Sequence, residues 1–263
     1  MQLIHTALVL PLHDPEGRIL NHLDRILPEL KKHFEHAFVS LSPLTTQRQQ
    51  AALQDFQQDG FFTFLDNPPG SSIGDHYLAG YRIALEHCQP ETRLHLCDLD
   101  KLCFILQSEH HQVYLQDLAW VGRQDLPVLF QRSPAAWETF PANYREIEQF
   151  IVHVGEMLFQ RYIDFAWSYM VMDAATLADL QPHITSDGFS LLTKILLQLD
   201  GKFMTKDVDW LSWEDPFILD RDADELRRER ETSLEECEKR LSYTLPNLQL
   251  LYEALRLKIQ SPK

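Results

Sequence analysis

Short apolar runs alternate with amphipathic stretches along the first part of the chain, and this alternation limits the folds that it can adopt. Apolar side chains recur from Ile19 to Leu30 at the i, i+3, i+4 spacing of a helix with one buried face. Strands are predicted at residues 6–12, 37–41, 61–65 and 93–97, and further helices at residues 45–58 and 74–88. Repeated strand–helix units predict an α/β fold, in which helices flank a mostly parallel, Rossmann-like sheet.

The connections after these four strands should share one edge of the sheet, because the carboxyl ends of parallel strands point the same way. Open α/β sheets bind their ligands at that edge. The segments predicted to lie there are residues 12–16, 40–43, 66–74 and 98–100. A binding site in this fold should therefore be built from side chains in these connections.

The second half of the chain is less regular. Strands are predicted at residues 127–131, 163–172 and 208–213, the second of them lying across the sheet, and helices at residues 147–158, 191–199 and 248–257. Residues 214–240 carry 11 acidic and 6 basic side chains, a pattern typical of a solvated helix face. We interpret residues 1–215 as one domain. Residues 216–263 then form a charged helical extension that packs on the domain or on a second copy of the chain, as in a homodimer.

The charge balance argues against two classes of function. The chain has 39 acidic and 24 basic residues, a formal charge of −15, which repels phosphate backbones and anionic lipid headgroups. Nucleic acid is therefore not an expected partner. An integral membrane segment is not expected either, because no apolar run approaches roughly 20 residues. The four cysteines lack the spacing of a zinc site or a disulfide framework, and the N-terminus does not resemble a signal peptide, so a cytoplasmic location is expected.

Two carboxylates follow the fourth predicted strand, and they are the sharpest chemical feature of the sequence. Asp98 and Asp100 are one residue apart, so both can reach a hard divalent cation, one directly and the other through water. Mg²⁺ or Mn²⁺ held in this way keeps several waters and bridges the phosphates of a substrate. The alternative is structural, since an Asp at a strand end is commonly a turn or helix-cap residue.

The order of these elements, with Asp98-Leu99-Asp100 directly after the fourth strand, resembles the GT-A fold of nucleotide-sugar glycosyltransferases. Within that fold the chain looks most like the family 2 enzymes that act on polyprenyl phosphates. Four further segments carry the resemblance: Gly74 to Gly80 with Ile83 and Ala84, the Gly-Phe segment at residues 187–192, Val208-Asp209-Trp210, and the acceptor-site region at residues 164–180. The resemblance implies a metal-dependent transfer of a sugar from a nucleotide-sugar to an acceptor.

The chain departs from the family pattern at its first two strands. Where the family has Pro-Ala-x-Asn-Glu, this sequence has Pro-Leu-His-Asp-Pro at residues 11–15, so the acid is absent or displaced to Asp14 or Glu16. The turn after the second strand, residues 40–43, carries no carboxylate. These departures keep open a second interpretation, a catalytically inactive GT-A-like protein that binds or interacts. A third, a nucleotidyltransferase, would usually carry a basic, glycine-rich loop near the first strand, which residues 13–18 match poorly.

The resemblance assigns residues to three tasks. Asp98 and Asp100 would bind the metal, and Asp14, Asp66, Gly74 and Asp98 would contact the donor. The loop at residues 66–74 precedes a helix, so its backbone amides can also cradle a phosphate, although an ordinary strand-to-helix loop explains it too. A transferase needs a base for the acceptor proton. Asp164 and Asp187 are the main candidates, with Glu214 and Asp215 as further ones.

Overall fold

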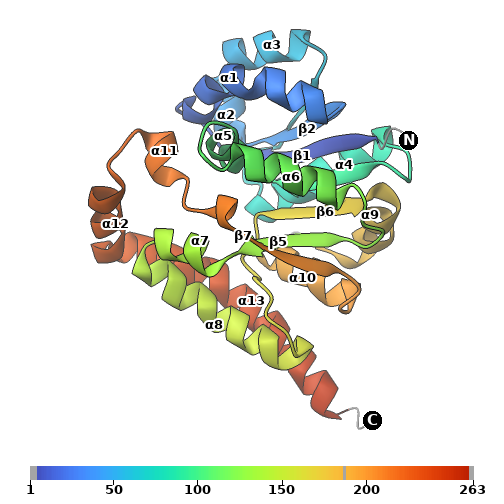
Figure 1. Ribbon diagram of the computed structural model, residues 1–263, viewed down its shortest axis with the longest axis vertical. Helices are drawn as coiled ribbons and strands as arrows, with labels where there is room; N and C mark the ends of the chain where they lie inside the picture. The colour runs from blue at the N-terminus through green and yellow to red at the C-terminus, as the bar shows by residue number, and fades with distance from the viewer. Residues whose placement is uncertain (1–4, 186–187, 261–263) are drawn as a thin grey trace.

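The computed structural model describes residues 5–185 and 188–260, and within them seven strands form one sheet (Figure 1). The strands are β1 (Thr6–Leu12), β2 (His36–Leu41), β3 (Phe62–Asp66), β4 (Arg93–Cys97), β5 (Val128–Arg132), β6 (Tyr169–Asp173) and β7 (Met204–Val208). Their order is β3-β2-β1-β4-β6-β5-β7. β6 runs antiparallel to both neighbours, and the other pairings are parallel. The predicted α/β fold on a mostly parallel sheet is confirmed.

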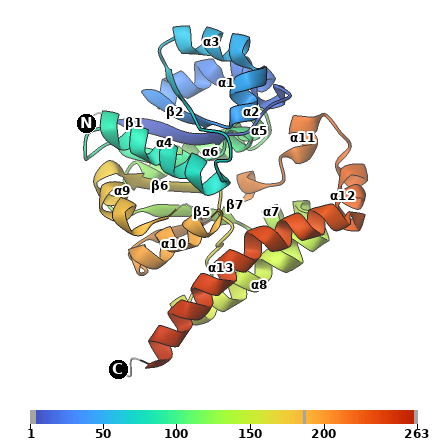
Figure 2. The ribbon, with the colours of Figure 1, turned by 180° about the vertical axis from the view of Figure 1, so that it is seen from behind.

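Helices cover both faces of the sheet (Figures 1 and 2). They are α1 (Arg18–His33), α2 (Pro43–Arg48), α3 (Gln50–Gln58), α4 (Ile73–His87), α5 (Leu99–Leu106), α6 (His111–Val121), α7 (Pro134–Thr139), α8 (Ala142–Phe159), α9 (Ala174–Leu180), α10 (Ser190–Leu199), α11 (Asp215–Leu219), α12 (Ala223–Thr232) and α13 (Leu234–Gln260). One core joins the sheet to α1, α3, α5 and α6, and a second core joins its other face to α4, α9 and α10.

The strand sequences explain this layering. Along β1, Leu8 and Leu10 pack into the first core, while Ala7 and Val9 pack into the second. Successive side chains of a strand point to opposite faces, so a strand buried on both faces must be apolar at every position. The continuous apolar run at the start of the chain therefore indicates a central strand, and β1 lies between β2 and β4.

Helix α4 packs closely against the sheet and carries Tyr77. Its start is fixed by a capping box, in which Asp75 N donates to Ser72 Oγ at 3.2 Å and Ser72 N donates to Asp75 Oδ2 at 2.7 Å. At Gly80, a Cβ atom would lie 3.2 Å from Val9 Cγ1, so the absence of a side chain permits this close approach. The approach brings Tyr77 to the carboxyl end of β4.

A long pair of helices that run parallel to each other, α8 and α13, extends beyond the sheet (Figures 1 and 2). Arg240 Nη1 of α13 donates to Glu148 Oε1 of α8 at 3.1 Å, and Tyr144 of α8 donates to Glu236. Leu251 is fully buried in the second core. The C-terminal helix is therefore longer than the predicted 248–257, because its charged first half is stabilised by ion pairs and burial against α8 that helix periodicity does not reveal.

Two predicted strands are wrong in extent. Residues 163–168 form a loop, and β6 begins at Tyr169. The loop's apolar residues are nevertheless buried, which explains the strand-like pattern. The predicted strand at 208–213 is instead the end of β7 followed by a 3-10 turn, Asp209–Leu211. β7 pairs with β5, whose last residue Arg132 lies opposite Val208, so the chain has no strand partner beyond that point.

Candidate functional site

Asp98 and Asp100 line a cavity of about 390 Å³ at the carboxyl edge of the sheet. Asp98 follows β4 and occupies the first position before α5, and Asp100 lies in the first turn of that helix. The Asp98 carboxylate accepts a hydrogen bond from the Tyr77 hydroxyl at 2.9 Å. β4 and β1 are neighbours at the place where the strand order reverses, which is where open α/β sheets form a ligand crevice. His13, which follows β1, lines the same cavity.

The two carboxylates sit in an environment that disfavours their charge. Burial raises the pKa of Asp98 to about 6, and the negative charge of Glu214 adds to this, while the Tyr77 hydrogen bond and Lys101 act in the opposite direction. Burial also raises the pKa of Asp100 well above its ordinary value, with further contributions from Glu214 and Asp98. A positive charge close to both groups would stabilise their ionised forms.

Lys101 supplies part of that positive charge. Its Nζ donates to the Ser212 carbonyl oxygen at 3.0 Å and forms a short ion pair with Glu214. The Lys101 side chain is only 7% exposed, so this ammonium group belongs to the interior of the site. It also lies 5.0 Å from the ring centroid of Phe140.

Arg132, at the end of β5, forms the next part of the wall. Its guanidinium donates to both carboxylate oxygens of Asp164, from Nε at 2.7 Å and from Nη2 at 2.8 Å. Nη1 donates to Glu148 at 2.7 Å, and the guanidinium lies 3.5 Å from the ring centroid of Trp137. Two carboxylates and an aromatic ring thus hold one cation in a fixed position.

Asp164 is fully buried, and it does not line the cavity. Besides the two bonds from Arg132, Oδ1 accepts from the Ala166 amide at 3.1 Å. Arg132 is thus the ion-pair partner of this buried carboxylate. A role as catalytic base stays a prediction. Asp187, the other main candidate, lies outside the described residues.

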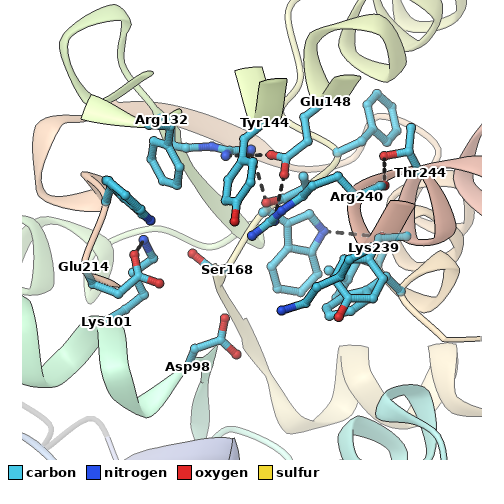
Figure 3. Close-up of a pocket in the computed structure, with 18 of the residues that line it drawn as sticks. Asp98, Lys101, Arg132, Tyr144, Glu148, Ser168, Glu214, Lys239, Arg240 and Thr244 are labelled. Carbon is cyan, nitrogen blue, oxygen red and sulfur yellow. Dashed lines mark hydrogen bonds and ion pairs between the residues drawn. The ribbon is translucent and has the colours of Figure 1, made fainter. Parts of the chain in front are cut away.

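The opposite wall of the cavity comes from the C-terminal helices. Arg230 of α12 and Lys239 and Arg240 of α13 line it, and Figure 3 shows Lys239 and Arg240 reaching toward the space that Asp98 and Ser168 face. The Arg240 guanidinium lies 3.6 Å from the ring centroid of Tyr144. The charged segment was expected to be a solvated helix face, and these three cations are a correction to that expectation.

Aromatic side chains complete the lining: Phe140, Phe165, Trp167, Phe189, Trp213 and Tyr243. Trp167 is held in place by donating its indole N–H to the Leu192 carbonyl oxygen at 3.3 Å. Flat apolar faces beside polar groups can stack on a sugar ring or a base. Trp210, by contrast, is fully buried and donates to Asp117 at 2.8 Å, so it belongs to the core.

The structure brings only some of the predicted site residues together. Asp98, Asp100, Glu214 and Asp215 line the cavity, and the remaining predicted donor contacts do not. Asp14 accepts from the amides of Arg18 and Leu20, at 2.8 and 2.9 Å, and so caps the start of α1. Asp66 is exposed and accepts from Thr46 at 2.7 Å. Gly74 is buried in the first turn of α4. Whether these three contact a donor stays a prediction.

Sequence reasoning missed the residues that reach the cavity from elsewhere in the fold. Tyr144 and Glu148 are one helical turn apart on α8 and share a face with Ile151. A polar pair on an otherwise apolar helix face is a sequence pattern that could have indicated these two residues. Phe150, whose apolar side chain helped to predict the helix at residues 147–158, is 58% exposed. For Lys239 and Arg240 the sequence carries no such signal, because neighbouring positions in that segment are also charged.

The carboxylates of the cavity can act as ligands of a divalent cation only together with other groups. Within residues 5–185 and 188–260, no three His, Cys, Asp or Glu side chains group closely enough to hold a metal alone. A magnesium site on a phosphorylated substrate needs fewer protein ligands, because one or two carboxylates act together with phosphate oxygens and water. Asp98 and Asp100 provide two hard oxygen donors on the same cavity wall. They therefore fit a cation that arrives with its substrate.

Comparison with known proteins supports the fold. No family model matches the chain, and no curated protein matches its sequence. Glucosyl-3-phosphoglycerate synthase from Mycobacterium tuberculosis, solved with uridine diphosphate, is 10% identical over 77% of this chain and 69% of that one, with a TM-score of 0.50. Another structure of that enzyme is 12% identical over 77% and 70%, also at 0.50. A 4-diphosphocytidyl-2C-methyl-D-erythritol synthase from Anaerococcus prevotii is 9% identical over 85% and 99%, at 0.47.

The chain thus has a GT-A-like fold, similar to that of the mycobacterial synthase. At these identities the likeness concerns the fold alone. No described helix combines the length and the apolar character needed to span a membrane.

Proposed function

We propose that this protein transfers a sugar from a nucleotide-sugar, with Mg²⁺ or Mn²⁺ as cofactor, to an acceptor bound between the sheet edge and the α8–α13 pair. One observation carries the proposal: Asp98 and Asp100 face a single cavity at the point where the strand order reverses. The GT-A-like fold supports it, as does the uridine diphosphate bound by the mycobacterial synthase.

Each wall of the cavity would have its own task. A cation bound at Asp98 and Asp100 would neutralise the diphosphate that leaves the donor. Tyr77 orients Asp98 through its hydrogen bond, and Lys101 adds a positive charge that does not depend on a metal. The aromatic lining offers faces on which the sugar or base can stack.

The acceptor proton needs a carboxylate that is not fully engaged. Asp164 has both oxygens bound by Arg132, so we assign it the task of holding Arg132 in the wall. Asp215 lines the cavity, and its ion pair with Arg230 is long, at 3.7 Å. Asp215 is therefore the better-placed base among the described candidates.

Calorimetric titration with nucleoside diphosphates and nucleotide-sugars, with and without Mn²⁺, tests the proposal. Binding should require the metal and should be lost in Asp98→Asn and in Asp100→Asn. Asp55→Asn, an equal change of charge at an exposed position of α3, is the matched control and should bind normally. Folded protein that binds no nucleotide in any combination would rule the proposal out.

The second candidate is a catalytically inactive GT-A-like binding protein. It is favoured by Lys101, whose ammonium group already pairs with Glu214 beside the two aspartates. It is also favoured by Asp14, whose carboxylate is occupied as a helix cap. Metal-independent ligand binding without release of nucleoside diphosphate during prolonged incubation with nucleotide-sugars and acceptors would support this candidate over the transferase.

A further inference from the structure

The cavity is lined by as many cations as acids, although the chain as a whole has a charge of −15. Its charged lining includes five acids, Asp98, Asp100, Glu148, Glu214 and Asp215, and five cations, Lys101, Arg132, Arg230, Lys239 and Arg240. Three of the five cations come from the C-terminal helices α12 and α13. These cations therefore do not follow from the overall composition and have to be explained locally.

Lys239 is a cation of the cavity lining that remains accessible to solvent, and in the described part of the chain it lacks a counterion. Within residues 5–185 and 188–260 it has neither a hydrogen-bond acceptor nor an ion-pair partner. Burial lowers its pKa, the positive charges of Arg240 and Arg230 lower it further, and Asp215 and Glu235 only partly oppose this. A cation kept close to two others is disfavoured unless an anion joins it.

Arg240 is fixed in place beside it. Its Nη1 donates to Glu148, its guanidinium stacks on Tyr144, and its Nε is buried with no acceptor in the described part of the chain. Glu148 also accepts from Arg132, so one carboxylate is shared between two guanidinium groups. Because Arg132 is also paired with Asp164, the two guanidinium groups are balanced by two carboxylates, and the charge of Lys239 is additional to this neutral cluster. A rigid guanidinium beside a flexible ammonium is a combination suited to the oxygens of a phosphate.

We infer that Lys239 and Arg240 form an oxyanion subsite that binds the phosphate group of a phosphorylated acceptor. Figure 3 shows these side chains on the wall across from Asp98, so an acceptor anchored there would present its hydroxyl group toward the sheet edge. The assignment of this phosphate to the acceptor rests on the proposed function, because the same cations could also bind the diphosphate of the donor. The binding of phosphate by itself needs neither nucleotide nor metal.

Titration of the full-length protein with inorganic phosphate at constant ionic strength tests the subsite. Lys239→Gln should weaken phosphate binding about tenfold, because a hydrogen bond to a charged group is lost. Lys239→Arg should restore most of the affinity. Lys202→Gln, at an exposed lysine, is the matched control and should bind as the parent protein does. No phosphate binding, or equal weakening in Lys239→Gln and Lys202→Gln, would overturn the inference.

A second titration separates the two sources of phosphate. Phosphate should still bind when nucleoside diphosphate and Mn²⁺ are present at saturation, because the acceptor subsite is distinct from the donor site. Competition between phosphate and the nucleotide would show that these cations hold the donor's diphosphate, and would overturn the acceptor assignment. Asp98→Asn should retain phosphate binding even if it binds no nucleotide, so failure of the proposed function would be recognised separately.

Discussion

The Tyr77 hydroxyl donates a hydrogen bond of 2.9 Å to the Asp98 carboxylate, and this contact joins helix α4 to the acidic edge of the sheet. Tyr77 is itself buried against the second core, so its position is set by packing. Asp98 consequently has one preferred orientation before any ligand arrives. In the proposed transferase this preorganisation would lower the cost of binding the donor.

Replacement of Tyr77 by Phe should therefore weaken binding more than it weakens the fold. We expect metal-dependent nucleotide affinity to fall about fivefold, the equivalent of about 1 kcal/mol for one hydrogen bond, with little change in thermal unfolding. Calorimetry and a melting curve on the same preparation measure both effects. Unchanged affinity would mean that Asp98 does not need this contact for its role.

Replacement of Asp164 by Asn should chiefly destabilise the protein. The change leaves the buried Arg132 guanidinium without one of its two carboxylates, and breaking such a pair costs about 3–5 kcal/mol. Urea denaturation measures the free energy of unfolding, with Asp55→Asn as the exposed control. A stable Asp164→Asn protein that has lost turnover would instead support the catalytic base predicted from the sequence.

Two helical glycines should differ sharply on replacement by Ala. At Gly155 a Cβ atom would lie 1.8 Å from Phe165 Cε2, whereas at Gly80 the nearest atom, Val9 Cγ1, is 3.2 Å away. Both changes gain helix propensity of about 1 kcal/mol, but the overlap at Gly155 should cost about 1–3 kcal/mol or more. Gly155→Ala should thus be the less stable variant in urea. Equal stability of the two variants would contradict the close packing of α8 on residues 163–168.

Stability should fall as the pH drops below about 6.5, partly because of His95. Burial, together with the charge of Arg93, lowers the pKa of His95 to about 3. Between the ordinary value of 6.5 and about 3, the unfolded chain binds a proton at this residue and the folded chain does not. The contribution of His95 is therefore fully present above pH 6.5 and is lost as the pH falls, by up to about 1.4 kcal/mol per pH unit.

Urea denaturation of the parent and of His95→Gln at pH 6.5 and 5.5 measures this slope. The variant should lose about 1 kcal/mol less than the parent over that interval, because the unfolded histidine is only half protonated at pH 6.5. His153→Gln is the control, because the His153 side chain is 82% exposed and should leave the slope unchanged. If His95→Gln keeps the parent's slope, the pH dependence originates elsewhere, for example at His36 or His76, whose pKa values burial also lowers.

Local patterns in the sequence determined the sheet, its buried central strands and the edge at which Asp98 and Asp100 lie. The apolar run of β1, the helical spacing after Ile19 and the two acids after β4 are all properties of neighbouring residues, and each predicted its element correctly. Strand limits were less certain, because a strand ends where its partner ends. β7 stops at Val208, opposite Arg132, although the residues that follow look like a strand.

Tertiary structure alone decided which charged residues share the site with Asp98. Arg132, Glu148 and Arg240 lie far apart in the chain and meet through one carboxylate held by two guanidinium groups. Charge density along residues 214–240 is the same for solvent-facing and cavity-facing positions, so it could not distinguish them. That distinction depends on how α13 packs against α8, since only packing determines which side chains are removed from water and which remain in it.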